Sequence, residues 1–274
     1  MRTWFTGIAA IALLAAAPAI AGYTEPDPAE SPHWPPIQQL LFGDRAINAD
    51  DREVIRVYLN LRADDASTVP VMVNGLIDQT AEEYIKRVYL VVERNPTQTA
   101  GVFDFTPDSG RVKVETRLRF EDFSFVRAVA EMNDGRLYMS QRYVRASGGC
   151  SAPNFKNLIP QEMMGKMRFR IDDSIQYNKP ALVQVQIRHP NESAMAVDME
   201  AGKVPQFVRS VNVTYNGKPV MTGQVDFSLS DNPVFRFYFV PREKGELRVE
   251  VEDTHDKVYV QSLSIAEGLV QPGT

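Results

Sequence analysis

Apolar and polar residues alternate along most of the chain between residues 54 and 146. In residues 54–61 (VIRVYLNL), every second side chain from Ile55 onward is apolar, which is the pattern of a strand with one buried face. Segments of the same character follow at 67–75, 85–96, 100–110, 111–120, 123–135 and 136–146. Turn signals such as Ser109-Gly110 and Asp134-Gly135 separate some of them. Seven short strands at regular spacing predict an antiparallel β-sandwich.

The strand pattern returns at Met167 and continues almost to the end of the chain. It covers residues 167–172, 181–190, 207–217, 218–230, 234–241, 246–253 and 257–265. Asn216-Gly217 is the strongest hairpin signal in the sequence, because this dipeptide suits the two central positions of a type I′ turn. We therefore expect a second β-sandwich of ordinary domain size over residues 167–274. The predicted fold class is all-β, with two sandwiches in tandem.

Other segments lack this alternation. Residues 22–42 are Pro-rich and polar and predict an extended lead-in, with one short helical turn near residues 37–44 that Gly43 closes. Thr80 and Glu83 have the spacing of a helix capping box. Residues 148–166 have no strand period and predict a flexible linker between a first domain at 43–147 and the second domain.

The first residues have the pattern of a secretory signal peptide over residues 1–21. Arg2 is followed by an apolar run, and Ala19-Ile20-Ala21 has the small-x-small form of a cleavage site. The run is shorter than the roughly 20 residues that span a bilayer, so we expect export to the periplasm, cleavage after Ala21 and no membrane span. The formal net charge of -5 gives no reason to expect a nucleic-acid partner.

Cys150 is the only cysteine and lies in the stretch RASGGCSAP between the two predicted domains. In an oxidising compartment, a lone thiol is buried, paired with another molecule or chemically used. Ser147, Gly148, Gly149 and Ser151 offer no apolar cover, which favours exposure over the alternative of a buried, inert cysteine. An exposed Cys150 on a swinging arm, with Gly148 and Gly149 as the hinge, would suit a carrier that other enzymes load and unload.

The rest of the chain offers little catalytic chemistry. The three histidines, His33, His189 and His255, lie far apart, and no spacing typical of a zinc site is present. There is no G-x-S-x-G motif and no phosphate-binding glycine loop. We therefore expect a protein that is not an enzyme, with no catalytic residue, no metal ligand and no cofactor.

The first half resembles SoxY, the sulfur-carrying subunit of the periplasmic thiosulfate-oxidising system. The matching stretches are VPVMV, YIKRVYLVVERNP, VKVETRLRF, VRAVAEMNDG and ASGGC. The second half resembles SoxZ, its partner subunit, in VQIRHPNES, VPQFVRSVNVTYNGKPV, LSDNPVFRFYF and LRVEVEDTHD. Both subunits are immunoglobulin-like β-sandwiches that form a tight heterodimer, so the resemblance implies two such domains paired within one chain through a large, fairly apolar interface.

A fused chain of this kind is similar to the SoxYZ-like carriers associated with quinoprotein dehydrogenases. The resemblance implies that Cys150 is the covalent carrier of a sulfur-containing intermediate. It also implies partners among periplasmic enzymes, a dehydrogenase that uses pyrroloquinoline quinone (PQQ) in methanol or other alcohol oxidation, and a c-type cytochrome. The sequence departs from the family in two places: GGC continues into SAPNF instead of ending the chain, and HPNES replaces His-Pro-Met-Glu-Thr-Gly. A second hypothesis is therefore a non-covalent docking module in which Cys150 has no role.

Overall fold

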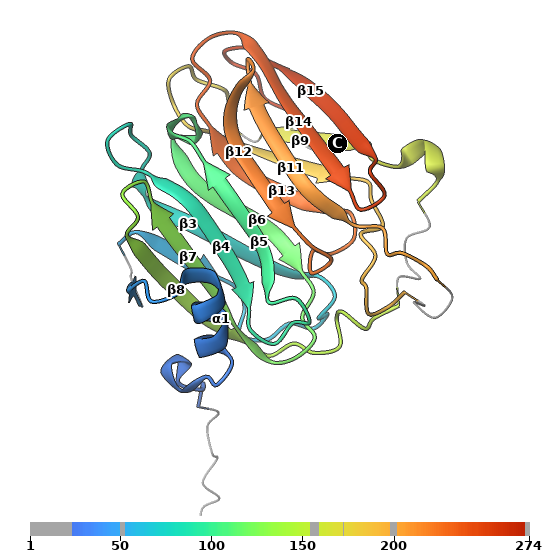
Figure 1. The fold of residues 1–274 in the computed structure, drawn as a ribbon. Coiled ribbons are helices and arrows are strands. Elements are labelled where there is room, and N and C mark those ends of the chain that lie inside the picture. Colours follow the sequence, from blue (N-terminus) through green and yellow to red (C-terminus); the bar gives the residue numbers. More distant parts are fainter. Residues whose placement is uncertain (1–23, 50–52, 154–158, 172, 198–201, 272–274) are drawn as a thin grey trace, which may run out of the picture.

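The computed structural model describes residues 24–49, 53–153, 159–171, 173–197 and 202–271. The predicted signal peptide lies outside these residues. Within them the chain is all-β and immunoglobulin-like, with two sheets packed face to face (Figure 1). The strands are β1 Ile47–Asn48, β2 Ile55–Tyr58, β3 Val69–Asp78, β4 Ile85–Val92, β5 Thr99–Phe105, β6 Arg111–Leu118, β7 Ser124–Met132, β8 Leu137–Val144, β9 Met167–Ile171, β10 Ala181–Ile187, β11 Val208–Tyr215, β12 Lys218–Val225, β13 Val234–Phe239, β14 Gly245–Asp253 and β15 Val258–Ile265.

Each segment predicted to be a strand overlaps one of these strands, and β3, β5 and β14 extend up to three residues beyond their predicted segments. The nine-stranded sheet has the order β1-β8-β7-β4-β5-β12-β11-β14-β15, and the six-stranded sheet has the order β2-β3-β6-β13-β10-β9. Apolar residues alternate toward the space between the sheets, for example Val69, Val71 and Val73 of β3. The two-residue strand β1, which pairs in parallel with β8, is too short to leave a pattern in the sequence.

Both sheets run without a break through the two halves of the molecule. Strand β5 of the first half pairs antiparallel with β12 of the second half, from Gly101 opposite Val225 to Phe105 opposite Met221. In the other sheet, β6 meets β13 where Glu115 lies opposite Arg236. One hydrophobic cluster contains buried residues from both halves. The two predicted sandwiches are therefore joined edge to edge into one double layer, with an apolar interface that is also hydrogen-bonded.

The lead-in is more ordered than the sequence suggests. The expected helical turn is a helix, α1, from Trp34 to Phe42, and Gly43 ends it with a φ of 59°. The prolines of its first turn fit there because the N–H groups of a first turn have no helical partner. Trp34, Ile37 and Phe42 are buried against the outer face of the nine-stranded sheet (Figure 1). The prediction of an extended lead-in was wrong because a helical period over nine residues was read as a single turn.

Two local predictions concern turns. Asn216 and Gly217 both have positive φ, 48° and 76°, as a type I′ hairpin between β11 and β12 requires. The side chain of Thr80 accepts a hydrogen bond from the Glu83 N–H at 3.1 Å, but no helix follows, because the chain enters β4 at Ile85. Capping geometry is thus present in a turn instead of at a helix start.

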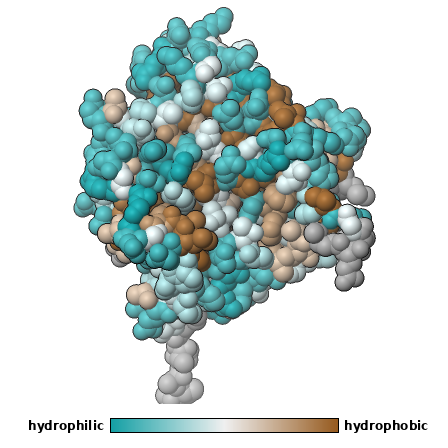
Figure 2. Space-filling model, viewed as in Figure 1, coloured by the Kyte–Doolittle hydropathy of each residue, from teal (hydrophilic) through white to brown (hydrophobic). Residues whose placement is uncertain are grey.

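The face of the molecule that carries α1 is mostly hydrophilic. Hydrophobic atoms appear near α1, where Leu40 is 82% exposed, and along the edge strand β15, where Val258 and Val260 are exposed (Figure 2). Among the described residues, the structure contains no helix with the length and apolar character needed to cross a membrane.

Candidate functional site

The segment that carries Cys150 follows β8 and lies against the residues that follow β6. The N–H of Gly148 donates to the carbonyl oxygen of Glu121 at 2.9 Å, and the N–H of Gly149 donates to that of Phe120 at 2.8 Å. Phe120 in turn donates to the carbonyl of Ala66, just before β3. The cysteine segment is thus bonded to the end of β6 without being a strand of either sheet.

The side chain of Glu121 holds this segment through three hydrogen bonds, which we call the Glu121 clasp. One carboxylate oxygen accepts the N–H groups of Cys150 at 3.2 Å and of Ser151 at 3.1 Å. The other accepts the Ser151 hydroxyl at 2.7 Å. Hydrogen bonds to a charged acceptor are stronger than neutral ones, so a single side chain fixes both residues.

In this conformation Gly148 and Gly149 are held by backbone contacts, and their role as a hinge stays a prediction. Gly148 has a φ of 77°, a backbone conformation that residues with side chains rarely adopt, and open space surrounds it. At Gly149, a Cβ atom would overlap the backbone carbonyl of Ala66 and lie 2.9 Å from the carbonyl oxygen of Phe120. The two glycines therefore let the chain turn once and then pass close to neighbouring backbone.

Cys150 is buried, and the expectation that it is exposed was wrong. Its relative exposure is 0%. Burial, helped by the nearby carboxylate of Glu121, raises the pKa of the thiol to about 12, while Arg119 acts in the opposite direction. At neutral pH, roughly one molecule in 10⁵ would carry the thiolate, compared with a few per cent for an ordinary cysteine. The thiol is therefore unreactive in this conformation.

Arg119 connects the cysteine to the boundary between the two halves. It is 2% exposed, and one guanidinium nitrogen donates to the carbonyl oxygens of Phe227, at 2.9 Å, and Leu229. The backbone N–H of Arg119 also donates to the carbonyl of Ser228 at 2.7 Å. Residues 227–229, which follow β12, are thus bound to the same stretch of the first half that holds Cys150.

A second buried carboxylate, Asp226, lies in this region. One of its oxygens accepts the N–H of Ser228 at 2.8 Å, and the other has no hydrogen-bond partner among the described residues. Burial raises the pKa of Asp226 to about 6, although the charge of Arg119 favours the ionised form. The surroundings of Cys150 therefore contain two acids and one arginine, and the acids disfavour a thiolate.

His189 and the altered loop have structural roles. His189 is fully buried: its Nδ1 accepts the N–H of Asn191 at 3.0 Å, and its Nε2 lies 3.3 Å from Asp253 Oδ2. Burial lowers the pKa of His189. Asn191, within HPNES, donates to the carbonyl of Leu229 at 2.7 Å. Through this hydrogen bond the loop helps to hold residues 227–229 in place. Within the described ranges, no group of three or more His, Cys, Asp or Glu residues is placed to hold a metal ion.

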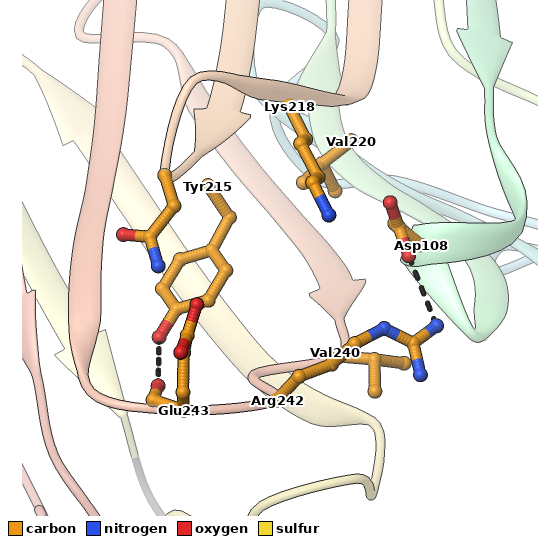
Figure 3. Close-up of a pocket in the computed structure, with 8 residues that line it drawn as sticks. Asp108, Tyr215, Lys218, Val220, Val240, Arg242 and Glu243 are labelled. Carbon is orange, nitrogen blue, oxygen red and sulfur yellow. Dashed lines mark hydrogen bonds and ion pairs between the residues drawn. The ribbon is translucent and has the colours of Figure 1, made fainter.

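A separate small cavity of about 60 Å³ lies where β11, β12 and the loop after β13 meet residues 107–109 (Figure 3). Arg242 bridges the halves through an ion pair with Asp108 at 3.0 Å, and the Tyr215 hydroxyl donates to the carbonyl of Glu243 (Figure 3). The cavity lies before β6 and Cys150 lies beyond it, so the two are separated by the length of that strand, roughly 26 Å. It is not part of the cysteine site.

The sequence located Cys150 but not the groups around it. Alternation along 111–120 places Arg119 on the outward side of the strand, yet the second half covers it. Asn95, in the turn after β4, donates to the carbonyl of Arg119 at 2.8 Å and accepts the N–H of Glu121 at 3.0 Å. These contacts join residues far apart in the chain, so no local pattern indicates them.

Two families match the chain in succession. Residues 38–150 match the sulfur oxidation protein SoxY, and residues 167–264 match the sulphur oxidation protein SoxZ. The first match ends on Cys150. No curated protein sequence matches the chain.

Among solved structures, the sulfur carrier protein SoxY from Chlorobium limicola f thiosulfatophilum is 20% identical. It covers 40% of this chain and 89% of its own, with a TM-score of 0.32. A superoxide reductase (neelaredoxin) from Ignicoccus hospitalis is 15% identical over 36% of this chain and 94% of its own, with a TM-score of 0.31. Fibronectin(III)-like modules of Clostridium thermocellum CbhA are 11% identical. The match covers 79% of this chain and 94% of the modules' chain, with a TM-score of 0.24. From the two family matches, this chain carries a SoxY domain followed by a SoxZ domain, which indicates a family of sulfur-oxidation carrier proteins.

Proposed function

We propose that this protein is a periplasmic thiol carrier that holds a sulfur-containing intermediate covalently on Cys150 and is loaded and unloaded by partner enzymes. The observation that carries this proposal is the way Cys150 is held. It is fixed by the Glu121 clasp and by the backbone contacts of two glycines, and its segment belongs to neither sheet. A segment held in this way can detach while both sheets stay intact.

The conformation in the structure is then the resting state of the carrier, in which Cys150 is buried. Burial keeps the thiol protonated, which protects it from stray oxidants, since the thiolate is the reactive form. Release would return the pKa to about 8.5 and raise the thiolate fraction at pH 7 by about 10³-fold. Breaking the clasp costs several hydrogen bonds of about 1–3 kcal/mol each, so a partner that binds the released form must supply that free energy.

Because the chain continues into a second domain, the released segment is a loop attached at both ends. Two strands of backbone side by side are about 5 Å wider than one. Cys150 therefore suits a partner site that is shallow or open at one side. A narrow tunnel would admit a free tail more readily than this loop.

For the partners, the sequence resemblance to fused SoxYZ-like carriers supports a PQQ-dependent alcohol dehydrogenase system with its c-type cytochrome, for example one that oxidises methanol. In cells grown on the alcohol, deletion of this protein should then impair alcohol-dependent growth. Normal growth of the deletion strain on methanol and other alcohols would exclude that partner system. N-terminal sequencing of the purified protein tests export, with Gly22 expected as the first residue.

The carrier function is tested by intact-mass measurement of the protein purified from the cells that make it. We expect an adduct on Cys150 that reductant removes and that Cys150→Ser lacks. In the purified protein, Glu121→Ala should raise the rate of reaction with a thiol reagent at least tenfold, with Ser151→Ala as a milder comparison. A Cys150 that is never modified in cells, and that stays inert in Glu121→Ala while the fold is intact, would exclude the carrier.

The burial of Cys150 specifically favours a second candidate, a docking module in which the thiol has no chemical role. In that case the molecule works through its surface alone. A Cys150→Ser strain would then behave as the wild type in alcohol-dependent growth. A Cys150→Ser strain as defective as the deletion strain would leave only the carrier.

A further inference from the structure

The outer face of the six-stranded sheet is covered by no other element of the described chain. Its strands place one set of side chains in the core and the alternate set on this outer face. The helix α1 and the lead-in lie on the other sheet (Figure 1). Whatever this face presents is therefore available to another molecule.

Cations dominate the face, which we call the basic face. Strand β6 contributes Arg111 and Arg117, together with Lys113, which is only 8% exposed and is bonded to Asn74. Strands β2, β9 and β13 contribute Arg56, Arg168, Arg170 and Arg236. The acids of these strands on the same face are Glu115 and Asp78. Seven cations against two anions give a formal charge of +5, in a chain whose total is -5.

The charges are arranged in register across the sheet. A single row of directly opposed residues crosses all six strands: Tyr58, Met72, Glu115, Arg236, Gln184 and Arg170. Glu115 lies 3.6 Å from Lys113 and 3.3 Å from Arg236, and Asp78 lies 3.5 Å from Arg111. Each acid is thus already placed beside a cation, and six of the seven cations are arginines, which keep their charge at any physiological pH.

One part of the nine-stranded sheet differs in charge. Strand β14 carries Glu246, Glu250 and Glu252 on its outer side, with Arg248 between them. This part of the molecule is therefore acidic, unlike the basic face. A nucleic acid would be repelled by it and by the net charge of -5, whereas a protein with a local acidic patch can approach the basic face alone.

We infer that the basic face is the surface on which an acidic patch of a partner protein docks. The guanidinium groups present paired N–H donors that match carboxylates, which lysines do not. Between them lie Tyr58, Met72 and Tyr238, residue types that are enriched at protein interfaces. Charge of this density also guides a partner of opposite sign toward the face before contact.

The position of the basic face fits the proposed function. The inference rests on that function in one point, namely that the protein works by binding partner proteins. Arg117, at one end of the basic face, is two residues from Arg119 and four from Glu121. A partner bound at that end would lie beside the Glu121 clasp. Docking itself needs no cargo, so it should persist in Cys150→Ser, whichever role the thiol has.

The test places a photo-cross-linking amino acid at Gln184, between Arg236 and Arg170 in the opposed row, in the cells that make the protein. The matched control position is Asn212, exposed on the outer side of β11 in the other sheet. We expect an adduct from position 184 with one other protein, whose cross-linked peptide is rich in Asp and Glu, and none from position 212. Arg168→Glu with Arg170→Glu should lower its yield at least tenfold, and Arg248→Glu should not.

The inference is overturned if position 184 gives no adduct or if positions 184 and 212 give equal adducts. An adduct with a second copy of this chain or with nucleic acid also overturns it. So does an adduct yield that the charge reversals leave unchanged while the fold is intact. Loss of the adduct in Cys150→Ser would also overturn it, because the face would then not dock by itself. An adduct that persists while Cys150 is never loaded supports docking and defeats only the carrier.

Discussion

Gly149 lies where the chain has no room for a side chain, because a Cβ atom there would overlap the backbone of Ala66. Gly148 differs: it has free space but a φ of 77°. Two different constraints therefore act on the two glycines: lack of space at Gly149 and a positive φ at Gly148. A glycine pair that served only as a hinge would show neither constraint.

The first prediction compares three substitutions. Gly149→Ala should lower the free energy of unfolding by about 1–3 kcal/mol, because it overpacks a backbone contact, and should speed the reaction of Cys150 with a thiol reagent. Gly148→Ala should cost only about 1 kcal/mol, through its positive φ. Gly135→Ala, with a φ of 91° and open space, is the control and should match Gly148→Ala. Urea unfolding measures all three, and equal effects at 148 and 149 would contradict the close packing.

The second prediction concerns the pH dependence of Cys150. Since burial raises the pKa of the thiol to about 12, its alkylation by iodoacetamide should become tenfold faster with each pH unit from 7 to 10, without levelling off. In Glu121→Ala the rate should level off above about pH 8.5. The folded state keeps its proton longer than the unfolded state, so stability should fall as the pH rises from 8.5 toward 12. A plateau near pH 8.5 in the wild type would contradict the burial.

At this scale the sequence predicted which residue to examine but not its environment. Cys150 is conspicuous as the only cysteine, and Ser147, Gly148 and Gly149 offer no apolar cover of their own. Its segment packs against distant parts of the chain: Gly149 donates to the carbonyl of Phe120 and lies close to the backbone of Ala66. Exposure depends on distant residues, so neighbours in sequence cannot decide it.

Among the elements, α1 and the lead-in are fixed to the nine-stranded sheet by one buried ion pair. Arg127 on β7 and Glu93 after β4 have side chains that are 2% and 1% exposed. Arg127 also donates to the carbonyl of Pro28 at 2.8 Å and stacks 4.6 Å from the ring centre of Trp34. Ser31 donates to Glu93 from the lead-in. The N-terminal segment is therefore part of the fold.

The third prediction follows from that ion pair. Arg127→Leu should cost about 3–5 kcal/mol of stability, because it leaves the carboxylate of Glu93 buried without its partner. The double variant Arg127→Leu with Glu93→Leu should recover part of that loss. Arg248→Ala breaks an exposed pair with Glu250 and should change stability by less than about 1 kcal/mol. Chemical denaturation of the four proteins measures this, and a loss for Arg127→Leu no larger than that for Arg248→Ala would contradict the role of the pair.

Strand positions followed from the sequence because alternation depends only on which side chains face the core. The neighbour of each strand did not follow. Nothing in the pattern of β5 or β12 indicates that they pair with each other, and a strand at the edge of one sandwich has the same alternation as a strand inside a longer sheet. For that reason the chain was expected to form two bodies with an interface, and the shared sheets were not anticipated.

On the scale of the whole molecule, the two halves share both sheets and one hydrophobic cluster. Phe103 and Phe235 pack across the boundary with ring centres 6.4 Å apart. Two arginines also bond across it, one near each end of β6: Arg242 pairs with Asp108, and Arg119 donates to the carbonyl of Phe227. Separation of the halves would expose an apolar surface and the strand edges of β5 and β12 at once.

The fourth prediction is that heating unfolds both halves in one transition. In calorimetry, the measured enthalpy should equal the van't Hoff enthalpy, as for a single cooperative unit. Phe103→Ala, at the boundary, should lower the temperature of that single transition without splitting it. Two resolved transitions in the wild type would mean that the halves fold independently.

The pairing of β5 with β12 also has a consequence for biosynthesis. When β5 and β6 have left the ribosome, the strands that complete their sheets have not been made, since β12 begins at Lys218, 100 residues after Leu118. At about 5–20 residues per second this interval is roughly 5–20 s. During it the nascent polypeptide presents bare edges that invite aggregation, so its safe maturation calls for a holding chaperone or for delayed folding until synthesis is finished.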